Sequence, residues 1–187
     1  MPSATWPVPF DPEHLYFITF AAIRHAHIFR RDVIKRILVD ALNTGRILGY
    51  FELYAFVIMP NHVHFILKCL KGKQPKDIVR DYKKATAMLI LRHFEAEGND
   101  EALEQLALAA PRPNKQQFAV WEHEYQAKNI YSPEFLIQKL TYIHNNPLQP
   151  HWRLAQRPED YLWSSARFYA GLGRALIPLS DARKLLE

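Results

Sequence analysis

The chain is poor in cysteine and has no long hydrophobic run. Cys69 is the only cysteine among 187 residues, which excludes a disulfide framework and a zinc ribbon and is typical of a reducing compartment. The first residues lack a positively charged segment followed by an apolar one, so we expect no signal peptide. No run is long and apolar enough to span a bilayer. These absences together predict a cytoplasmic protein.

The composition that remains is that of a basic globular protein. Hydrophobic residues make up 49% of the chain, which excludes a disordered protein, and the length suits a single domain over residues 1–187. Residues 1–13 are Pro-rich and are expected to be irregular. The formal net charge of +5 favours a polyanionic partner, with nucleic acid first.

The most informative stretch is AFVIMPNHVHFIL at residues 55–67, which reads as two strands joined by a tight turn at Pro60 and Asn61. Side chains alternate across a strand, so His62 and His64 are expected on one face. Neutral imidazole is a common ligand of divalent metals, and two of them at a strand mouth can hold one if a third ligand is present. The alternative is a pair of solvated or hydrogen-bonded histidines.

The periodicity of the chain predicts an α+β protein with a ferredoxin-like split βαβ fold, which is an antiparallel sheet with helices on one face. We expect a further helix and a tail, residues 148–187, at the C-terminal end. An acidic, Ala-rich insertion at about 95–117 is expected to hold a short helix and a flexible end. Gly45 is expected just past the end of the first helix. The predicted strands are 15–20, 50–58, 62–68 and 118–126, and the predicted helices are 31–44, 76–94 and 133–145.

The last of these helices carries a second polar constellation. Its apolar stripe is Leu136, Leu140 and Ile143, and Tyr142 lies off that stripe. Residues four apart are neighbours on a helix, so Tyr142 and Asn146 are expected to project together. Core packing does not explain a tyrosine at this position. It is either a catalytic residue or a hydrogen-bonded surface residue.

Basic residues are candidates for contact with phosphates. Arg80, Lys83 and Lys84 lie off the apolar stripe of the second helix, where they form either a solvated face or a phosphate-binding one. Arg153 and Arg167 lie among the aromatic residues of the tail, a pattern that suits single-stranded nucleic acid. The tail's aromatic residues themselves are expected to pack back on the core.

The segment MPNHVHFIL resembles the HUH motif (His, apolar residue, His) of the single-tyrosine, IS200-like transposases. The segments YIHNNP and RPEDYLWSSARFY resemble two motifs of their REP-associated branch. The resemblance implies a metal-dependent endonuclease and strand transferase that acts on single-stranded, hairpin-forming repeats of bacterial genomes, through a 5′-phosphotyrosine intermediate. It implies that Tyr142 is the nucleophile and that His62, His64 and Asn146 bind Mg²⁺ or Mn²⁺. It leaves open whether the protein is a monomer or a homodimer.

Two other classes of function compete with this one. A relative of such an enzyme could bind hairpin DNA and regulate it without turnover, and covalent capture of DNA would distinguish the two. A ferredoxin-like protein could also bind single-stranded RNA, in which case aromatic residues are expected on an exposed face of the sheet.

Overall fold

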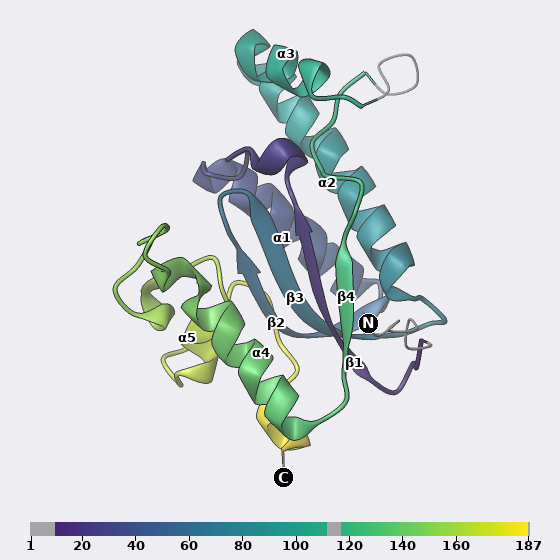
Figure 1. Ribbon diagram of the computed structural model, residues 1–187, viewed down its shortest axis with the longest axis vertical. Helices are drawn as coiled ribbons and strands as arrows, with labels where there is room; N and C mark the ends of the chain where they lie inside the picture. Colours follow the sequence, from purple (N-terminus) through teal and green to yellow (C-terminus); the bar gives the residue numbers. More distant parts are fainter. Residues whose placement is uncertain (1–9, 112–116, 187) are drawn as a thin grey trace, which may run out of the picture.

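The computed structural model describes residues 10–111 and 117–186, so most of the N-terminal segment expected to be irregular lies outside the described residues (Figure 1). Its four-stranded sheet has the order β2-β3-β1-β4, and each pair of neighbours is antiparallel. This is the predicted ferredoxin-like arrangement. The strands are β1 (Leu15–Ala21), β2 (Phe51–Ile58), β3 (His62–Cys69) and β4 (Gln126–Ile130).

Two layers of helices enclose the sheet. The helices α1 (Asp32–Ile47) and α2 (Pro75–Glu97) lie behind it in Figure 1, and α4 (Pro133–Asn145) lies in front of it. The short α3 (Asp100–Leu108) stands beyond the sheet, beside the end of α2, and α5 (Ala166–Tyr169) belongs to the C-terminal tail. Among the described residues, no helix is both long enough and apolar enough to cross a membrane.

The alternation of side chains along the strands divides the core between the two helical layers. Phe20 and Phe65 point to the α1 and α2 side, where both rings meet that of Tyr82 edge to face. Phe17 and His64 point to the α4 side, and both rings lie against Tyr142. The sheet is therefore buried on both faces, and α4 covers the face that carries the two histidines.

The fourth strand was predicted at 118–126, and this prediction is wrong because β4 begins only at Gln126. Ala119, Val120 and Trp121 are buried, but they fill the core beyond the end of β1, where Trp121 forms a single bridge with Ala22. The carbonyls that follow, at residues 122–124, accept hydrogen bonds from the Lys83 ammonium instead of from a strand. β4 is polar because it is an edge strand, with its first three residues exposed.

The first helix was predicted to end before Gly45, but α1 continues to Ile47. Glycine usually weakens a helix interior, which explains the expectation. The reason for a glycine at this position is the aromatic ring of Phe51, because a Cβ on Gly45 would lie 2.7 Å from Cε1 of that ring. Here close packing of α1 on the start of β2 decides the residue, and helix propensity does not.

The acidic insertion contains the short helix that was predicted, α3, whose N-cap is Asn99. The Asn99 side chain accepts a hydrogen bond from the amide of Ala102. The flexible end predicted for the insertion falls on residues 112–116, which lie outside the described residues.

The aromatic residues of the tail pack on the core as predicted, because the tail runs along the free edge of β2. Ser164 bridges Val57, and the Ile58 amide donates to the carbonyl of Trp163. The hydroxyls of Tyr161 and Tyr169 donate to β2 carbonyls, those of Ile58 and Tyr54. The tail thus pairs with an edge that would otherwise expose unpaired backbone groups.

We expect Gly45→Ala to destabilise the protein by about 1 kcal/mol, because the steric penalty of overpacking exceeds the gain in helix propensity. Urea unfolding measures this difference. In a Phe51→Leu background the same substitution should instead stabilise the protein. A stabilising effect of Gly45→Ala in the wild-type background would contradict the packing described here.

Candidate active site

The fold brings together the four residues that the two sequence constellations single out. His62 and His64 lie at the start of β3, and Tyr142 and Asn146 lie on the last turn of α4 and at its C-cap. The His62 and His64 ring centroids are 4.8 Å apart, and those of His64 and Tyr142 are 5.1 Å apart. The Asn146 amide nitrogen lies 3.2 Å from Nε2 of His64.

His64 is the centre of this group. It is only 3% exposed, and its ring stacks on Phe17 at 5.4 Å. Burial holds its pKa well below the ordinary value, and the nearby His62 and Lys139 lower that pKa further, so the ring is neutral. Because Nε2 accepts from Asn146, the proton is on Nδ1, which donates to the Thr19 hydroxyl at 2.7 Å.

His62 is fixed in the same way from the other side. Its Nδ1 lies 2.6 Å from the side-chain oxygen of Asn61, which can only accept, so Nδ1 is the donor. Burial lowers its pKa to about 4. Both imidazoles are therefore neutral with the lone pair on Nε2, and that of His64 accepts from the Asn146 amide.

Asn146 supplies the third polar group. It follows α4 at the C-cap with helical dihedral angles, so the i,i+4 relation to Tyr142 is kept although Pro147 comes next. The side chain is 4% exposed, and its carbonyl oxygen is buried with no hydrogen-bond partner among the described residues. A buried acceptor without a donor is unfavourable, and such an atom is typical of a ligand-binding position.

Two imidazole nitrogens and one amide oxygen are a donor set that fits a divalent cation. Within residues 10–111 and 117–186 there is no group of three His, Cys, Asp or Glu side chains that could hold a metal. A cation at this site would therefore need the Asn146 amide or an oxygen of the substrate as its third ligand.

Tyr142 is the accessible member of the group. Its side chain is 42% exposed, while one edge of its ring rests on Phe17 and His64. In the part of the chain that the structure describes, its hydroxyl has no hydrogen-bond partner. The arrangement presents a free phenol to solvent directly beside the two neutral imidazoles.

Lys139 belongs to this site and was missed from the sequence. It lies one turn before Tyr142 on α4, and its ammonium stands over the rings of Phe17 and Tyr142, at 4.9 and 5.6 Å from their centroids. Burial and the charge of Lys128 lower its pKa. The i,i+3 spacing between Lys139 and Tyr142 was the signal that could have identified it.

Trp152 was also missed, since a lone tryptophan after a turn has no motif. Its ring lies 5.9 Å from that of His62 and 5.3 Å from that of His27, which comes from the loop after β1. Trp152 therefore lies between His62 on β3 and the loop after β1.

The five basic residues predicted to bind DNA do not form one cluster. Arg80, Lys83 and Lys84 line a cavity of about 560 Å³ on α2. Within it Arg80 pairs with two aspartates, and the Lys83 ammonium is bound by three backbone carbonyls. Arg153 and Arg167 lie in the tail and do not line this cavity. Lys83 therefore has a structural role in addition to any contact with a phosphate.

Comparisons with known proteins agree with this architecture. Residues 13–105 match the family model described as "Transposase IS200 like". The fold matches a solved structure described as a REP-associated tyrosine transposase bound to a REP hairpin, with a TM-score of 0.62 and 18% identity, over 92% of this chain and 87% of that one. A putative transposase from Deinococcus radiodurans R1 matches with a TM-score of 0.44 and 21% identity, over 75% of this chain and 95% of that one. No curated protein matches the chain.

Proposed function

Because the chain belongs to the family of IS200-like transposases, we propose that it cuts and rejoins single-stranded, hairpin-forming DNA through a covalent bond to Tyr142. The observation that carries the proposal is the position of this hydroxyl, exposed and unpaired next to two neutral imidazoles and the orphaned oxygen of Asn146. The family match ends before Tyr142, so the role of that residue rests on geometry and chemistry.

The reaction that suits this geometry is attack of the Tyr142 oxygen on a phosphodiester. The new bond joins the tyrosine oxygen to phosphorus, and the bond to the 3′ oxygen breaks. That oxygen leaves as a 3′-OH after taking up a proton, and the 5′ side of the strand stays on the tyrosine. Since the energy of the phosphoester is kept, a 3′-OH can reverse the step and rejoin DNA.

A phenol has an ordinary pKa near 10, so its ionisation needs help at neutral pH. We assign this help to Lys139, whose positive charge lies over the Tyr142 ring and favours the phenolate as it forms. The nearby apolar surface of Phe17 strengthens the interaction by excluding water on one side.

His62, His64 and Asn146 are the residues that would hold a divalent cation, Mg²⁺ or Mn²⁺. Such an ion polarises the scissile phosphate and offsets its negative charge. The Thr19 and Asn61 side chains fix the proton of each imidazole on Nδ1, so Nε2 is the ligating nitrogen, and at His64 a cation would replace the Asn146 N–H. Second partners of this kind typically raise the metal affinity of a histidine site.

Hairpin DNA is the substrate class that we infer. The similar solved structure is of a REP-associated transposase bound to a REP hairpin, and this chain has a basic surplus. Lys76 and Lys84 line the cavity on α2 and form no ion pair with a described residue, so they are suited to backbone phosphates, while unpaired bases would carry the sequence information. The single-stranded RNA alternative loses its main support, since α4 covers the sheet face on which Phe17 lies and this ring is buried.

We expect Tyr142→Phe to bind labelled hairpin DNA as the wild type does but to form no adduct, because only the attacking oxygen is removed. A denaturing gel run after incubation with Mn²⁺ shows the slow protein–DNA band. Tyr131→Phe is the matched control, since Tyr131 is also exposed. Binding without an adduct by the wild type would instead favour a non-catalytic hairpin-binding protein.

We expect Thr19→Val to lower Mn²⁺ affinity about 10- to 100-fold, because the His64 ring loses the hydroxyl that fixes its tautomer. Isothermal titration measures the affinity, and circular dichroism checks that the variant is folded. Thr19→Ser keeps the hydroxyl and should bind as the wild type does. His64→Ala should lose Mn²⁺-dependent cleavage, and undiminished cleavage by that variant would remove the metal from the proposal.

We expect Lys139→Met to slow cleavage about 100-fold at neutral pH, a typical size for loss of help with a proton transfer. Lys184→Met removes an exposed charge of the C-terminal tail and serves as the control. Cleavage by Lys139→Met at the wild-type rate would overturn the assignment.

A further inference from the structure

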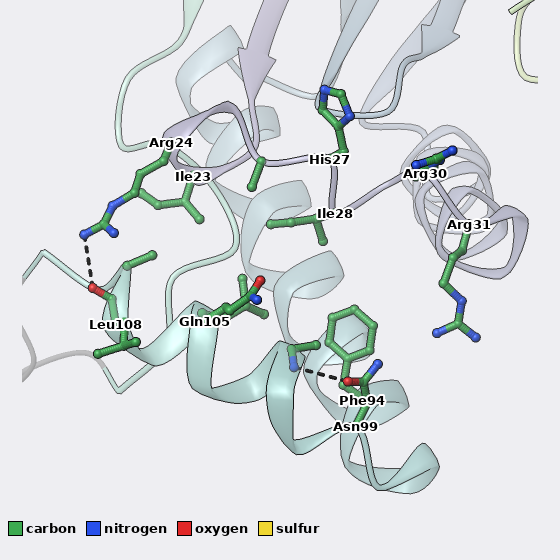
Figure 2. A pocket seen from close by; sticks show the side chains of 14 residues that line it. Ile23, Arg24, His27, Ile28, Arg30, Arg31, Phe94, Asn99, Gln105 and Leu108 are labelled. Carbon is green, nitrogen blue, oxygen red and sulfur yellow. Dashed lines mark hydrogen bonds between the residues drawn. The ribbon is translucent and has the colours of Figure 1, made fainter.

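A cavity of about 580 Å³ lies outside the candidate active site, between the loop that follows β1, the end of α2, and α3 (Figure 2). We name it the α3 cavity. One of its walls belongs to the insertion that the ferredoxin-like frame does not require. None of the functional residues predicted from the sequence lines it.

The lining of the α3 cavity combines an apolar floor with a cationic rim. Ile23, Phe94 and Leu106 are buried and form part of the floor. Arg24 stands on one side and Arg30 on the other, as Figure 2 shows. No carboxylate is among the lining residues, although α3 itself carries several on its surface.

Arg24 and Arg30, the two arginines of the rim, differ from their neighbour Arg31 because the guanidinium group of neither forms an ion pair with a described carboxylate. Arg31 is bound by both carboxylate oxygens of Glu97, at 2.6 Å each. The Arg24 guanidinium donates one hydrogen bond, to the carbonyl of Leu108 in the last turn of α3, while the Arg24 backbone amide donates to the Glu122 carboxylate. The Arg30 side chain makes no ion pair with a described residue. The exposed amide of Gln105 adds a group that can both donate and accept.

The shape of the cavity is fixed by its walls. Arg24 ties the loop after β1 to α3, and both Arg24 and His25 hold positive φ angles of 51° and 52°. Such conformations are unfavourable for residues with a side chain and persist where the surroundings impose them. The loop is held near its start by the Arg24 contact with α3 and near its end by the Phe29 amide, which donates to the carbonyl of Pro60.

The α3 cavity is linked to the candidate active site by aromatic rings. The backbone of the loop lines the cavity at His27, whose ring lies 5.3 Å from Trp152, and Trp152 lies 5.9 Å from His62. A strand in B-form DNA advances about 3.4 Å per nucleotide, and an extended strand advances further. A strand with its phosphate at His62 would thus reach the cavity within a few nucleotides.

We propose that the α3 cavity takes one unpaired base of the DNA strand that enters the active site. The proposal rests on the proposed function, because it names a second contact with the same substrate. A base is a flat apolar ring with a polar edge and a flanking phosphate on each side. The apolar floor matches the ring, the Gln105 amide matches its polar edge, and the two rim arginines match the flanking phosphates.

The test is a scan of abasic sites. A hairpin with unpaired flanks is made with one base at a time removed from the flanks, and affinity is measured by fluorescence anisotropy in a Tyr142→Phe background. We expect one flank position whose loss weakens binding about tenfold, the effect of a lost base contact. Ala102→Phe fills the cavity and should remove this penalty. Gln105→Ala and Arg30→Ala, which change only exposed side chains, should reduce it.

Glu104→Ala and Arg92→Ala are matched controls on exposed positions of α3 and α2 outside the cavity. The proposal is overturned if the cavity variants do not change the loss of affinity caused by any missing base, or if they weaken binding equally whichever base is missing. Formation of the covalent adduct is measured separately on the intact hairpin with Tyr142 present. If the cavity variants change the effect of one missing base but no adduct forms, only the proposed reaction is refuted. If an adduct forms but no such base is found, only the role of the α3 cavity is refuted.

Discussion

The position of the candidate site depends on one buried side chain, His64. Its two ring nitrogens bond to different elements, Nδ1 to Thr19 on β1 and Nε2 to Asn146 at the end of α4. Because the ring is closed off from solvent and neutral, it fixes the sheet and α4 relative to one another with no charge to compensate. The tyrosine one turn earlier on α4 is thereby placed over the same ring.

The rest of α4 is built to keep this contact in register. Ser132 caps the helix by accepting from the Phe135 amide, and Pro133 occupies its first turn, so its start is well defined. Leu140 and Ile143 bury a neighbouring stripe of α4 in the core. A helix with a fixed start and a buried stripe has little freedom to rotate, and this keeps Tyr142 and Asn146 on the side of the histidines.

Much of this arrangement could be predicted from the sequence, because it follows from local periodicity. The alternation in β3 placed His62 and His64 on one face, and helical spacing placed Tyr142 with Asn146. The fourth strand and the end of α1 could not be predicted, since both depend on distant contacts. Lys83 binds the carbonyls of residues 122–124 from α2, and the ring of Phe51 imposes Gly45. In both places the local sequence favours a different structure: residues 118–126 resemble a strand, and Gly45 resembles the end of a helix.

The orphaned oxygen of Asn146 shows how the site and the stability of the fold oppose each other. A leucine there would fill similar space without an unpaired acceptor, so stability alone does not select an amide. The surrounding structure can carry this penalty because the tail runs along β2 and holds the same end of α4, where His144 bonds to the hydroxyl of Ser165. The end of α4 is thus held by both the sheet and the tail. An unsatisfied acceptor at such a position is expected where ligand binding, and not packing, determines the residue.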